Sequence, residues 1–336
     1  MSPSLQYLER CAANTGFQVA PLEKLARLGE FAADVARHPF LGSALALKGG
    51  TALNLCFGAP RRLSVDLDFN YVAHAAREKM IEDREQVEST ACEIARRHGY
   101  RVQRSADSFA GRKLFLRYRS VLGHDDRIEV DLNYLFRTPI GETQRLSLWQ
   151  PGELDRPEVR VVGVTELVIG KLLAFLDRAA ARDVWDAANL PDVALETMRT
   201  HFFRRWFVAL SAVLPHRLPS YSRGRLEGLM TDRTVAEHLA PLLVRGEPPS
   251  ARDLVERGWG TVEPLLALEA DEAAYVVAID RGELRPQLLF PDHADEAARI
   301  GTHPALLWKI EKVRAGDISR RDQRRGRRLC GRPKGN

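Results

Sequence analysis

Two short segments in the first half of the chain alternate between apolar and polar residues. They read SVDLDFNY and RIEVDLNY, and their polar positions include Asp66, Asp68 and Asp131. Side chains two residues apart on a strand lie on the same face of a sheet. Each segment therefore predicts a strand with one apolar face for a core and one face of carboxylates plus an amide. If both strands belong to one sheet, the two acidic faces can point the same way.

Other periodic segments predict further elements around these two strands. Apolar residues three and four apart predict helices over about 4–14 and 22–37, and a long charged helix over 74–98 that closes at Gly99. Another helix is predicted to begin near Thr165. Short apolar runs between turn residues predict strands near 43–48, 112–119, 127–135 and 158–162.

After about residue 190 the signals are nearly all helical, and prolines divide them into segments. The pattern thus predicts an α+β fold, with a small mixed sheet and flanking helices followed by a helical C-terminal domain. We expect a sheet-containing domain over 1–190, a helical domain over 191–319 and a basic tail over 320–336.

The composition is that of an ordinary globular protein. Apolar residues make up 45% of the 336 and charged residues 28%. No apolar run approaches the roughly 18 residues that a membrane helix needs, and the first residues lack the features of a secretory signal. The four cysteines are scattered without a CxxC pair, which argues against disulfides or a zinc ribbon. We expect a cytoplasmic protein without a membrane partner.

The charge is unevenly distributed. Residues 320–336 hold eight Lys and Arg and one Asp, which leaves 42 basic and 44 acidic residues in the rest of the chain. Such a segment has almost nothing to bury, so we expect disorder there. Two interpretations remain open: a solvated tail with no role, and an arm that contacts RNA through its positive charge.

Clustered carboxylates raise each other's pKa unless a cation neutralises them. Asp66 and Asp68, with Asp131 from a neighbouring strand, could share two metal ions about 3.5–4 Å apart. Oxygen ligands of this kind suit Mg²⁺ or Mn²⁺. The alternative is that both polar faces are simply solvated. Glu129 is the weaker candidate ligand, because Asp131 lies mid-strand between two aliphatic residues.

A pair of glycines stands between a predicted strand and a predicted helix. Gly49 and Gly50 permit positive φ and a close approach of the backbone to phosphate at a helix N-terminus. Lys48 precedes the glycines and no GK[ST] follows, so this is not a P-loop. Ser64 is expected on the same strand face as the aspartates, where its hydroxyl could donate to a phosphate. Alone, the glycine pair could be ordinary turn chemistry.

Residues 165–190 are rich in Ala and Leu and predict one helix or two in series. On a single helix, Lys171, Arg178 and Arg182 would form one stripe, with Asp186 at its side. These charges could serve a site. They could equally be solvated, with Arg182 and Asp186 forming an i,i+4 pair.

The order of these motifs resembles the DNA polymerase β-type nucleotidyltransferase superfamily. The string LALKGGTALNLCFGAPRRLSVDLDF is similar to one branch of it, the AbiEii-type toxins of type IV toxin–antitoxin and abortive-infection systems. The resemblance is strong over 40–70 and 160–190 and looser at HPALLWK near the end. Many members of the superfamily have serine where this chain has Gly50, so a phosphate contact there would use the backbone.

The resemblance also implies roles for the helix over 165–190. Its members carry a Lys, an Arg and an Arg-Asp-x-x-Asp at about this spacing, which implies Lys171 on the triphosphate of the incoming nucleotide. Asp183 would be a further essential acid, with Arg182 and Asp186 supporting the geometry or the phosphates. The choice between Asp183 and Asp186 as the essential acid stays open.

What the resemblance implies overall is a metal-dependent toxin that transfers a nucleotide from an NTP to RNA, at the 3′ end of tRNA, and so blocks translation. A cognate antitoxin would hold it in check. The enzymatic alternative is nucleotidylation of a protein Ser, Thr or Tyr. The non-enzymatic alternative is a silent regulator that binds NTP or RNA, and the joint presence of Ser64, the three aspartates and Lys171 argues against it.

Overall fold

The alternating segments form neighbouring strands of one sheet in the computed structural model, which describes residues 3–316. The expected tail over 320–336 and Cys330 lie outside the described residues. The sheet has the order β3-β4-β5-β2-β1-β7-β6, and only the β2–β5 and β1–β7 pairs are parallel. Its strands are β1 (Leu45–Lys48), β2 (Asp66–Tyr71), β3 (Arg101–Arg104), β4 (Gly111–Arg119), β5 (Asp125–Asn133), β6 (Gln144–Ser147) and β7 (Glu158–Val161).

The described chain forms two compact units. The first comprises residues up to Thr200 together with Ser222–Val262, so it extends past the boundary expected at 190 because the chain returns to it. Its helices are α1 (Leu5–Thr15), α2 (Val19–Arg37), α3 (Leu41–Ala44), α4 (Gly49–Leu55), α5 (Arg77–Arg97), α6 (Val164–Asp177), α7 (Ala181–Ala188), α8 (Asp192–Met198), α10 (Arg223–Leu229), α11 (Asp232–His238), η2 (Ala240–Leu242) and α12 (Ala251–Val262).

The second unit comprises His201–Tyr221 and the described residues from Glu263 onward. All its described elements are helical, as expected for this part of the chain. It is built around buried aromatic residues such as Phe207, Tyr275 and Phe290. Its elements are α9 (His201–Ser211), η1 (Leu218–Ser220), η3 (Glu263–Leu265), α13 (Ala270–Asp280), η4 (Pro286–Leu288), α14 (Ala294–Gly301) and α15 (Pro304–Arg314).

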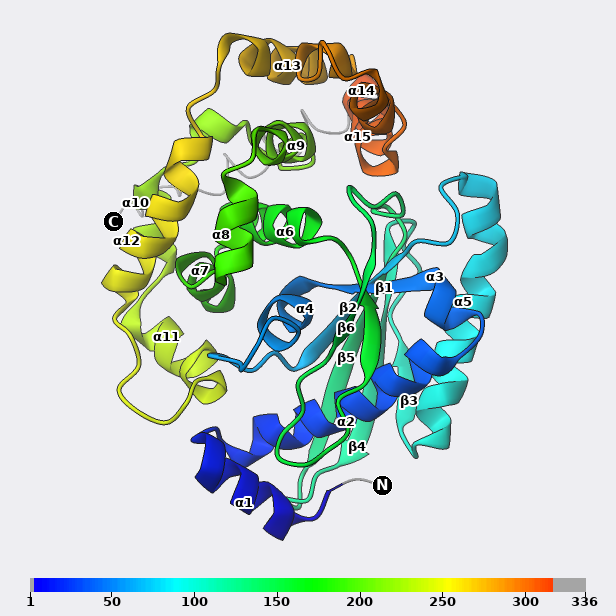
Figure 1. The fold of residues 1–336 in the computed structure, drawn as a ribbon, viewed down its shortest axis with the longest axis vertical. Coiled ribbons are helices and arrows are strands. Elements are labelled where there is room, and N and C mark those ends of the chain that lie inside the picture. Colours follow the sequence, from blue (N-terminus) through cyan, green and yellow to red (C-terminus); the bar gives the residue numbers. More distant parts are fainter. Residues whose placement is uncertain (1–2, 317–336) are drawn as a thin grey trace, which may run out of the picture. The chain divides into compact units, whose positions relative to one another are not determined.

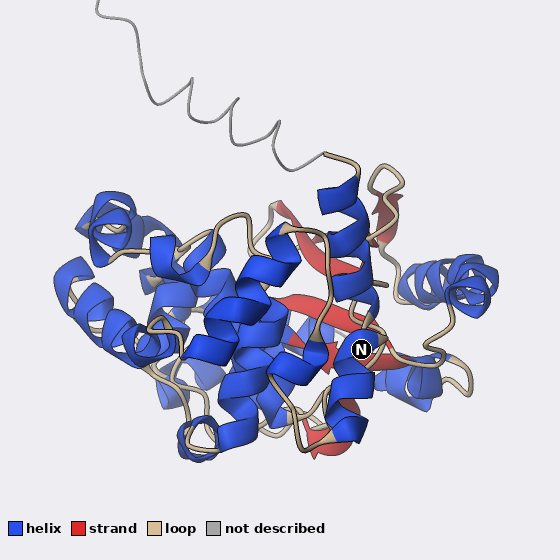
Figure 2. Cartoon of the chain, turned by 90° about the horizontal axis from the view of Figure 1, so that it is seen from above, coloured by secondary structure: helices blue, strands red, loops and turns tan. Residues whose placement is uncertain are grey.

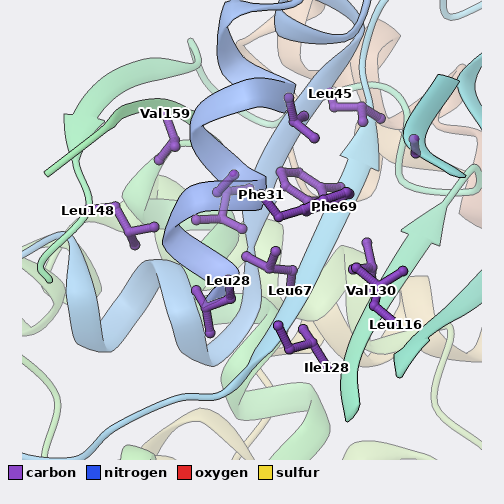
Figure 3. Packing of buried hydrophobic residues seen from close by; sticks show 14 of the residues in the cluster. Leu28, Phe31, Leu45, Leu67, Phe69, Leu116, Ile128, Val130, Leu148 and Val159 are labelled. Carbon is purple, nitrogen blue, oxygen red and sulfur yellow. The ribbon is translucent and has the colours of Figure 1, made fainter. Parts of the chain in front are cut away.

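Helices lie on both sides of the sheet in the first unit, and on the second side α4 contacts β1 and β2. In Figure 1, α2 and α5 lie on one side of the strands and α4, α6 and α7 on the other, and Figure 2 shows the same layering from above. The helices α2 and α5 contact the strands through apolar side chains. Figure 3 shows Leu28 and Phe31 of α2 packed with Leu67 and Phe69 of β2. This core fixes which face of β2 is buried, and therefore which face carries the acids.

Most of the predicted elements are present within a few residues, and the α+β fold is confirmed. The helix predicted over 22–37 begins earlier, at Val19, because Pro21 fits the first turn of a helix. The strand predicted over 43–48 is shorter, because its first residues close the short helix α3. The strands β3 and β6 were not predicted. None of the helices in the described part is long and apolar enough to cross a membrane.

Candidate active site

The parallel pairing of β2 with β5 sets the acidic residues side by side. Asp68 is the register partner of Asp131, and Asp66 is the partner of Glu129. The residues between them on each strand point into the core, so all four carboxylates are on the opposite face. On β1, Lys48 is the register partner of Asp68. The acidic faces of the two strands therefore lie on the same side of one sheet, as expected from the sequence.

The turn between β1 and α4 brings the backbone against these acids. Gly49 has φ of +73°, a conformation that only glycine adopts readily. A Cβ at this position would collide with the carboxylate of Asp68. A Cβ at Gly50 would stand 3.1 Å from Ser64 Oγ, and the hydroxyl of Thr51 donates to that same oxygen at 3.0 Å. The two glycines thus allow the chain to pass directly beside the acidic cluster.

The segment over 165–190 is two helices in series, α6 and α7. They are separated at residues 178–180, where Ala179 has φ of +49°. Because the chain turns at this break, the single charged stripe that one continuous helix would give does not form. The turn instead brings Asp183 back to Lys171, whose Nζ lies 3.1 Å from its Oδ1.

Buried ion pairs connect the two helices to the strand region. Lys171 Nζ lies 2.7 Å from Asp186 Oδ2, and Arg62 donates to both oxygens of Asp186 at 3.0 and 2.8 Å. Arg178 makes two hydrogen bonds to Asp183. Burial alone would raise the pKa of Asp183, but the charges of Lys171 and Arg178 outweigh it and lower that pKa. The interpretation of these charges as solvated is therefore wrong for Lys171, Asp183 and Asp186.

The pairing of Arg182 also differs from the i,i+4 pair considered above. Its Nη1 donates to Asp66 Oδ2 at 2.8 Å, and Asp186 is bound by Arg62 and Lys171 instead. The reason is the break before α7, which directs the start of this helix toward β2. Arg182 therefore reaches the acidic cluster itself.

The remaining acids of the cluster differ in how well they are neutralised. Glu129 lies 3.0 Å from Lys113 and 2.7 Å from Arg127. Burial would raise the pKa of Glu129, but these two cations lower it. The pKa of Asp131 is raised, first by burial and then by the charge of Asp68. Asp68 makes no ion pair with any residue that the structure describes.

Residues 3–316 contain no ready-made group of three or more His, Cys, Asp and Glu side chains that could hold a metal ion. Asp66, one of the three expected ligands, is in contact with Arg182. The chemistry of the donors still suits Mg²⁺ or Mn²⁺, which prefer carboxylate oxygens. Asp68 and Asp131 offer such oxygens side by side, and the nearest cation to Asp131 is Lys113 at 3.9 Å.

A cavity of about 150 Å³ joins these groups into one site. Most of the residues singled out from the sequence line it, but Gly49 and Asp186 do not. Asp183 lines the cavity and Asp186 does not, although both side chains are buried. Ser64 precedes β2 and does not belong to it, yet it faces the same cavity. The lining residues are Gly50, Arg62, Ser64, Asp66, Leu67, Asp68, Lys113, Glu129, Asp131, Lys171, Arg178, Arg182 and Asp183.

Two charged residues of the lining were not singled out from the sequence. Arg62 is 1% exposed and holds Asp186, and Lys113 on β4 faces Glu129 and Asp131 across the strand pair. A signal existed for Lys113, since it lies at an alternate position of a predicted strand. Arg62 stands next to another arginine in a turn, and nothing in that pattern marks one of the two as buried.

The arrangement can be compared with known proteins. No curated protein matches the sequence. Among solved structures, MenT4, a nucleotidyltransferase toxin from Mycobacterium tuberculosis H37Rv, matches with a TM-score of 0.60 at 20% identity. The match covers 89% of this chain and 99% of that one. The likeness extends over nearly the whole of both chains, and at this identity it shows the fold.

The family model for the nucleotidyl transferase AbiEii toxin of type IV toxin–antitoxin systems matches residues 32–257. The matched span contains all seven strands of the sheet, the glycine turn and the helices α6 and α7, and thus every residue that lines the cavity. The match, the fold and the acidic cavity agree with one another. The chain belongs to the AbiEii family of nucleotidyl transferase toxins.

Proposed function

We propose that this enzyme transfers a nucleotide from an NTP to a hydroxyl at the 3′ end of an RNA, with tRNA as the acceptor. The acceptor oxygen would bond to the α-phosphorus while the bond to pyrophosphate breaks. The observation that carries the proposal is the parallel register of β2 and β5, which sets Asp68 beside Asp131 at a cavity lined by Lys171 and Arg182. Carboxylates and cations around one cavity are what phosphoryl transfer requires.

Asp66, Asp68 and Asp131 would hold two Mg²⁺ or Mn²⁺ ions. When bound, such metals lower the pKa of the attacking hydroxyl and neutralise charge on the transferring phosphate. Support comes from Asp68, which has no ion pair among the described residues, and from the pKa of Asp131, which burial and then the charge of Asp68 raise. Arg182 would release Asp66, and its guanidinium would then be free to bind a phosphate oxygen.

The nucleotide would bind against the opposite wall of the cavity. Lys171 would contribute positive charge to the triphosphate, and Asp183 would orient the ammonium through its 3.1 Å contact. Ser64 would donate its hydroxyl to a phosphate oxygen, and the backbone at Gly50 leaves room for that approach. Asp186 does not line the cavity and would act by holding Lys171 in place through their 2.7 Å contact.

A toxin of a type IV system implies an antitoxin as partner, and the family implies an NTP as substrate. We propose RNA as the acceptor and the cytoplasm, where NTP and RNA occur together, as the compartment. RNA is favoured over protein by the arginines near the cavity and by the basic run after residue 319, because phosphate groups are the partners that such charges bind most strongly. Blocked translation would follow from the altered tRNA end.

The proposal is tested by incubating the protein with each α-labelled NTP, Mg²⁺ or Mn²⁺, and total RNA or cell lysate. We expect label to appear on RNA of tRNA size and pyrophosphate to be released. Neither should occur in reactions that contain EDTA. Label on protein, with none on RNA, would replace the proposed acceptor by a protein hydroxyl. Label on neither RNA nor protein would contradict the proposed transfer to RNA.

A further inference from the structure

Three arginines form a row across the open face of β3, β4 and β5. Arg101 is the register partner of Arg117, and Arg117 is the register partner of Arg127. All three are exposed, whereas Leu116 and Tyr118 beside Arg117 and Ile128 beside Arg127 are buried. Cross-strand partners share a face, so the three guanidinium groups project from the same side of the sheet. We call this set, Arg101, Arg117 and Arg127, the arginine row.

The row is unfavourable for the stability of the isolated sheet. Like charges directly opposite one another on neighbouring strands destabilise a sheet. Two neighbouring acids offset part of the charge: Asp125 lies 3.6 Å from Arg101, and Glu129 lies 2.7 Å from Arg127. Arg117, at the centre, donates to the neutral side chain of Gln103 at 3.2 Å. The row therefore keeps positive charge that an anionic partner could use.

The row is continuous with the acidic cluster along the same face. On β4, Lys113 lies four residues before Arg117. Lys113 is the register partner of Asp131, and Asp131 is the register partner of Asp68. A strand rises about 3.3 Å per residue, so the row and the cluster are roughly 13 Å apart. This is a short path for an extended polynucleotide. A strand whose 3′ end lies at the carboxylates could place its preceding phosphates over the arginines.

An aromatic ring lies between the row and the cluster. Phe115 is on the same face of β4, two residues from Arg117 and two from Lys113, and it is half-buried. The guanidinium carbon of Arg127 lies 5.0 Å from the centroid of its ring. Aromatic rings beside cations are how many proteins bind single-stranded nucleic acid, with bases stacking on the ring and phosphates on the cations.

We infer that this face, formed by the arginine row and Phe115, binds the single-stranded 3′ segment of the acceptor RNA and leads its end into the carboxylate cluster. The inference rests on the proposed function, because it names where the proposed RNA acceptor lies. The arginines also solve an electrostatic difficulty of that function. The carboxylates repel the phosphates of the acceptor, and the row supplies the attraction that holds the strand beside them.

The test compares two triple variants with the same change in charge. The first replaces Arg101, Arg117 and Arg127 by alanine. The control replaces by alanine three arginines on α2, α10 and α11, namely Arg37 and Arg233, which are exposed, and Arg223, which is half-buried. Binding of a fluorescein-labelled single-stranded RNA of 12 nucleotides and of deacylated tRNA is followed by anisotropy, without NTP or metal, over a range of salt concentrations.

For the first variant we expect binding of both RNAs to weaken roughly 100-fold near 0.1 M salt, and the slope of log K against log salt to fall by about 2, since each phosphate contact contributes about 0.7. The control should bind like the wild type. The thermal midpoint of the first variant should not fall, because its substitutions remove repulsion. A matched loss of affinity in both variants would overturn the inference, since it would show only the effect of net charge.

A second variant, Phe115→Leu, separates stacking from charge. It keeps an apolar side chain against Arg127 but removes the ring, so RNA binding should weaken roughly tenfold with an unchanged salt slope. Label transfer from NTP to RNA then distinguishes a wrong acceptor from a wrong location of the bound RNA. If the wild type labels protein and binds no RNA, the proposed acceptor fails. If it labels RNA while both the triple variant and Phe115→Leu bind RNA as the wild type does, only this inference fails.

Discussion

At the scale of single residues, the site is distinguished by which acids have a cation and which do not. Asp183 and Asp186 are each held by two basic side chains, and Asp66 is held by Arg182. Asp68 has no ion pair among the described residues, and the nearest cation to Asp131 lies 3.9 Å away. Poorly neutralised acids are costly beside one another, and the metal ions proposed above would remove this cost.

We therefore expect Asp68→Asn and Asp66→Asn to abolish nucleotide transfer. The loss should be at least roughly 10³-fold, because the metals supply several kcal/mol of transition-state stabilisation. Label transfer at saturating Mg²⁺ measures it, with Glu237→Gln on α11 as a control that should keep full activity. Thermal unfolding of both variants should stay close to the wild type without metal, since Asp68→Asn relieves repulsion and Asp66→Asn loses only a partly exposed ion pair with Arg182. Near-normal transfer in both would refute the assignment of the metal ligands.

A different prediction concerns Lys171, which is buried between two carboxylates. Lys171→Met should destabilise the fold by about 3 kcal/mol, since it leaves Asp183 and Asp186 with less compensating charge. In the wild type both acids have lowered pKa values, so their contribution to stability is present above about pH 4 and is lost as the pH falls below it.

In Lys171→Met the two carboxylates should regain protons at higher pH, because burial would no longer be offset by the ammonium. The difference in unfolding free energy between variant and wild type should thus be largest above about pH 5 and shrink below about pH 4. Urea unfolding at several pH values measures it. Lys79→Met, which changes an exposed lysine on α5, serves as the control. A constant difference across this range would mean that the buried charges do not determine the effect.

At the scale of elements, the junction of β1 and α4 is the part of the site most sensitive to backbone geometry. Gly49→Ala should cost about 1–2 kcal/mol for the positive φ alone, and more because the new Cβ meets the carboxylate of Asp68. Nucleotide transfer should fall as well, since Asp68 must move. Activity and urea unfolding measure the two effects.

Gly50→Ala is the matched comparison at the same junction. Gly50 is not at positive φ, and its Cβ would stand 3.1 Å from side-chain atoms of Arg62 and Ser64, whereas a Cβ at Gly49 would stand 2.3 Å from Asp68 Oδ2. We expect a smaller loss of stability than for Gly49→Ala. Equal losses in the two variants would show that the backbone conformation of Gly49 is not what makes the position special.

Some elements could be predicted from the sequence and others could not. The strands β2, β4 and β5 were predicted because one of their faces is buried and the residues alternate accordingly. The edge strands β3 and β6 are mostly polar on both faces, so no alternation marks them. The sequence did not predict the break after α6 either. It falls in a run of alanines, the strongest helix formers, and the ion pair of Arg178 with Asp183 stabilises it.

The same reasoning applies to the site. The acids and glycines form local motifs, and the sequence could name them. The partners of those acids depend on contacts between distant segments. Arg62 and Asp186 are 124 residues apart, and Arg182 and Asp66 are 116 apart. Spacing along one helix suggested that Arg182 pairs with Asp186, whereas the break between α6 and α7 directs Arg182 to β2 instead.

At the scale of the whole molecule, the charge of the chain must be reconciled with the RNA acceptor that we propose. The 42 basic and 44 acidic residues outside the last 17 give no net attraction for RNA. Attraction must therefore be local, and the chain offers two sources. One is the arginine row on the sheet, and the other is the basic run after residue 319, which lies outside the described residues.

Deleting residues 320–336 should reduce RNA affinity and flatten its dependence on salt, because eight Lys and Arg are removed with one Asp. Each neutralised phosphate adds about −0.7 to the slope for a single strand, so the change in slope measures how many phosphates this run neutralises. Transfer at saturating RNA should persist, because every residue proposed for the chemistry lies before this run. Combined with the arginine-row variant, the losses in log K should add if the two sources act independently. An unchanged slope after deletion would exclude the run as an RNA contact, and loss of transfer at saturating RNA would require it to act in the site itself.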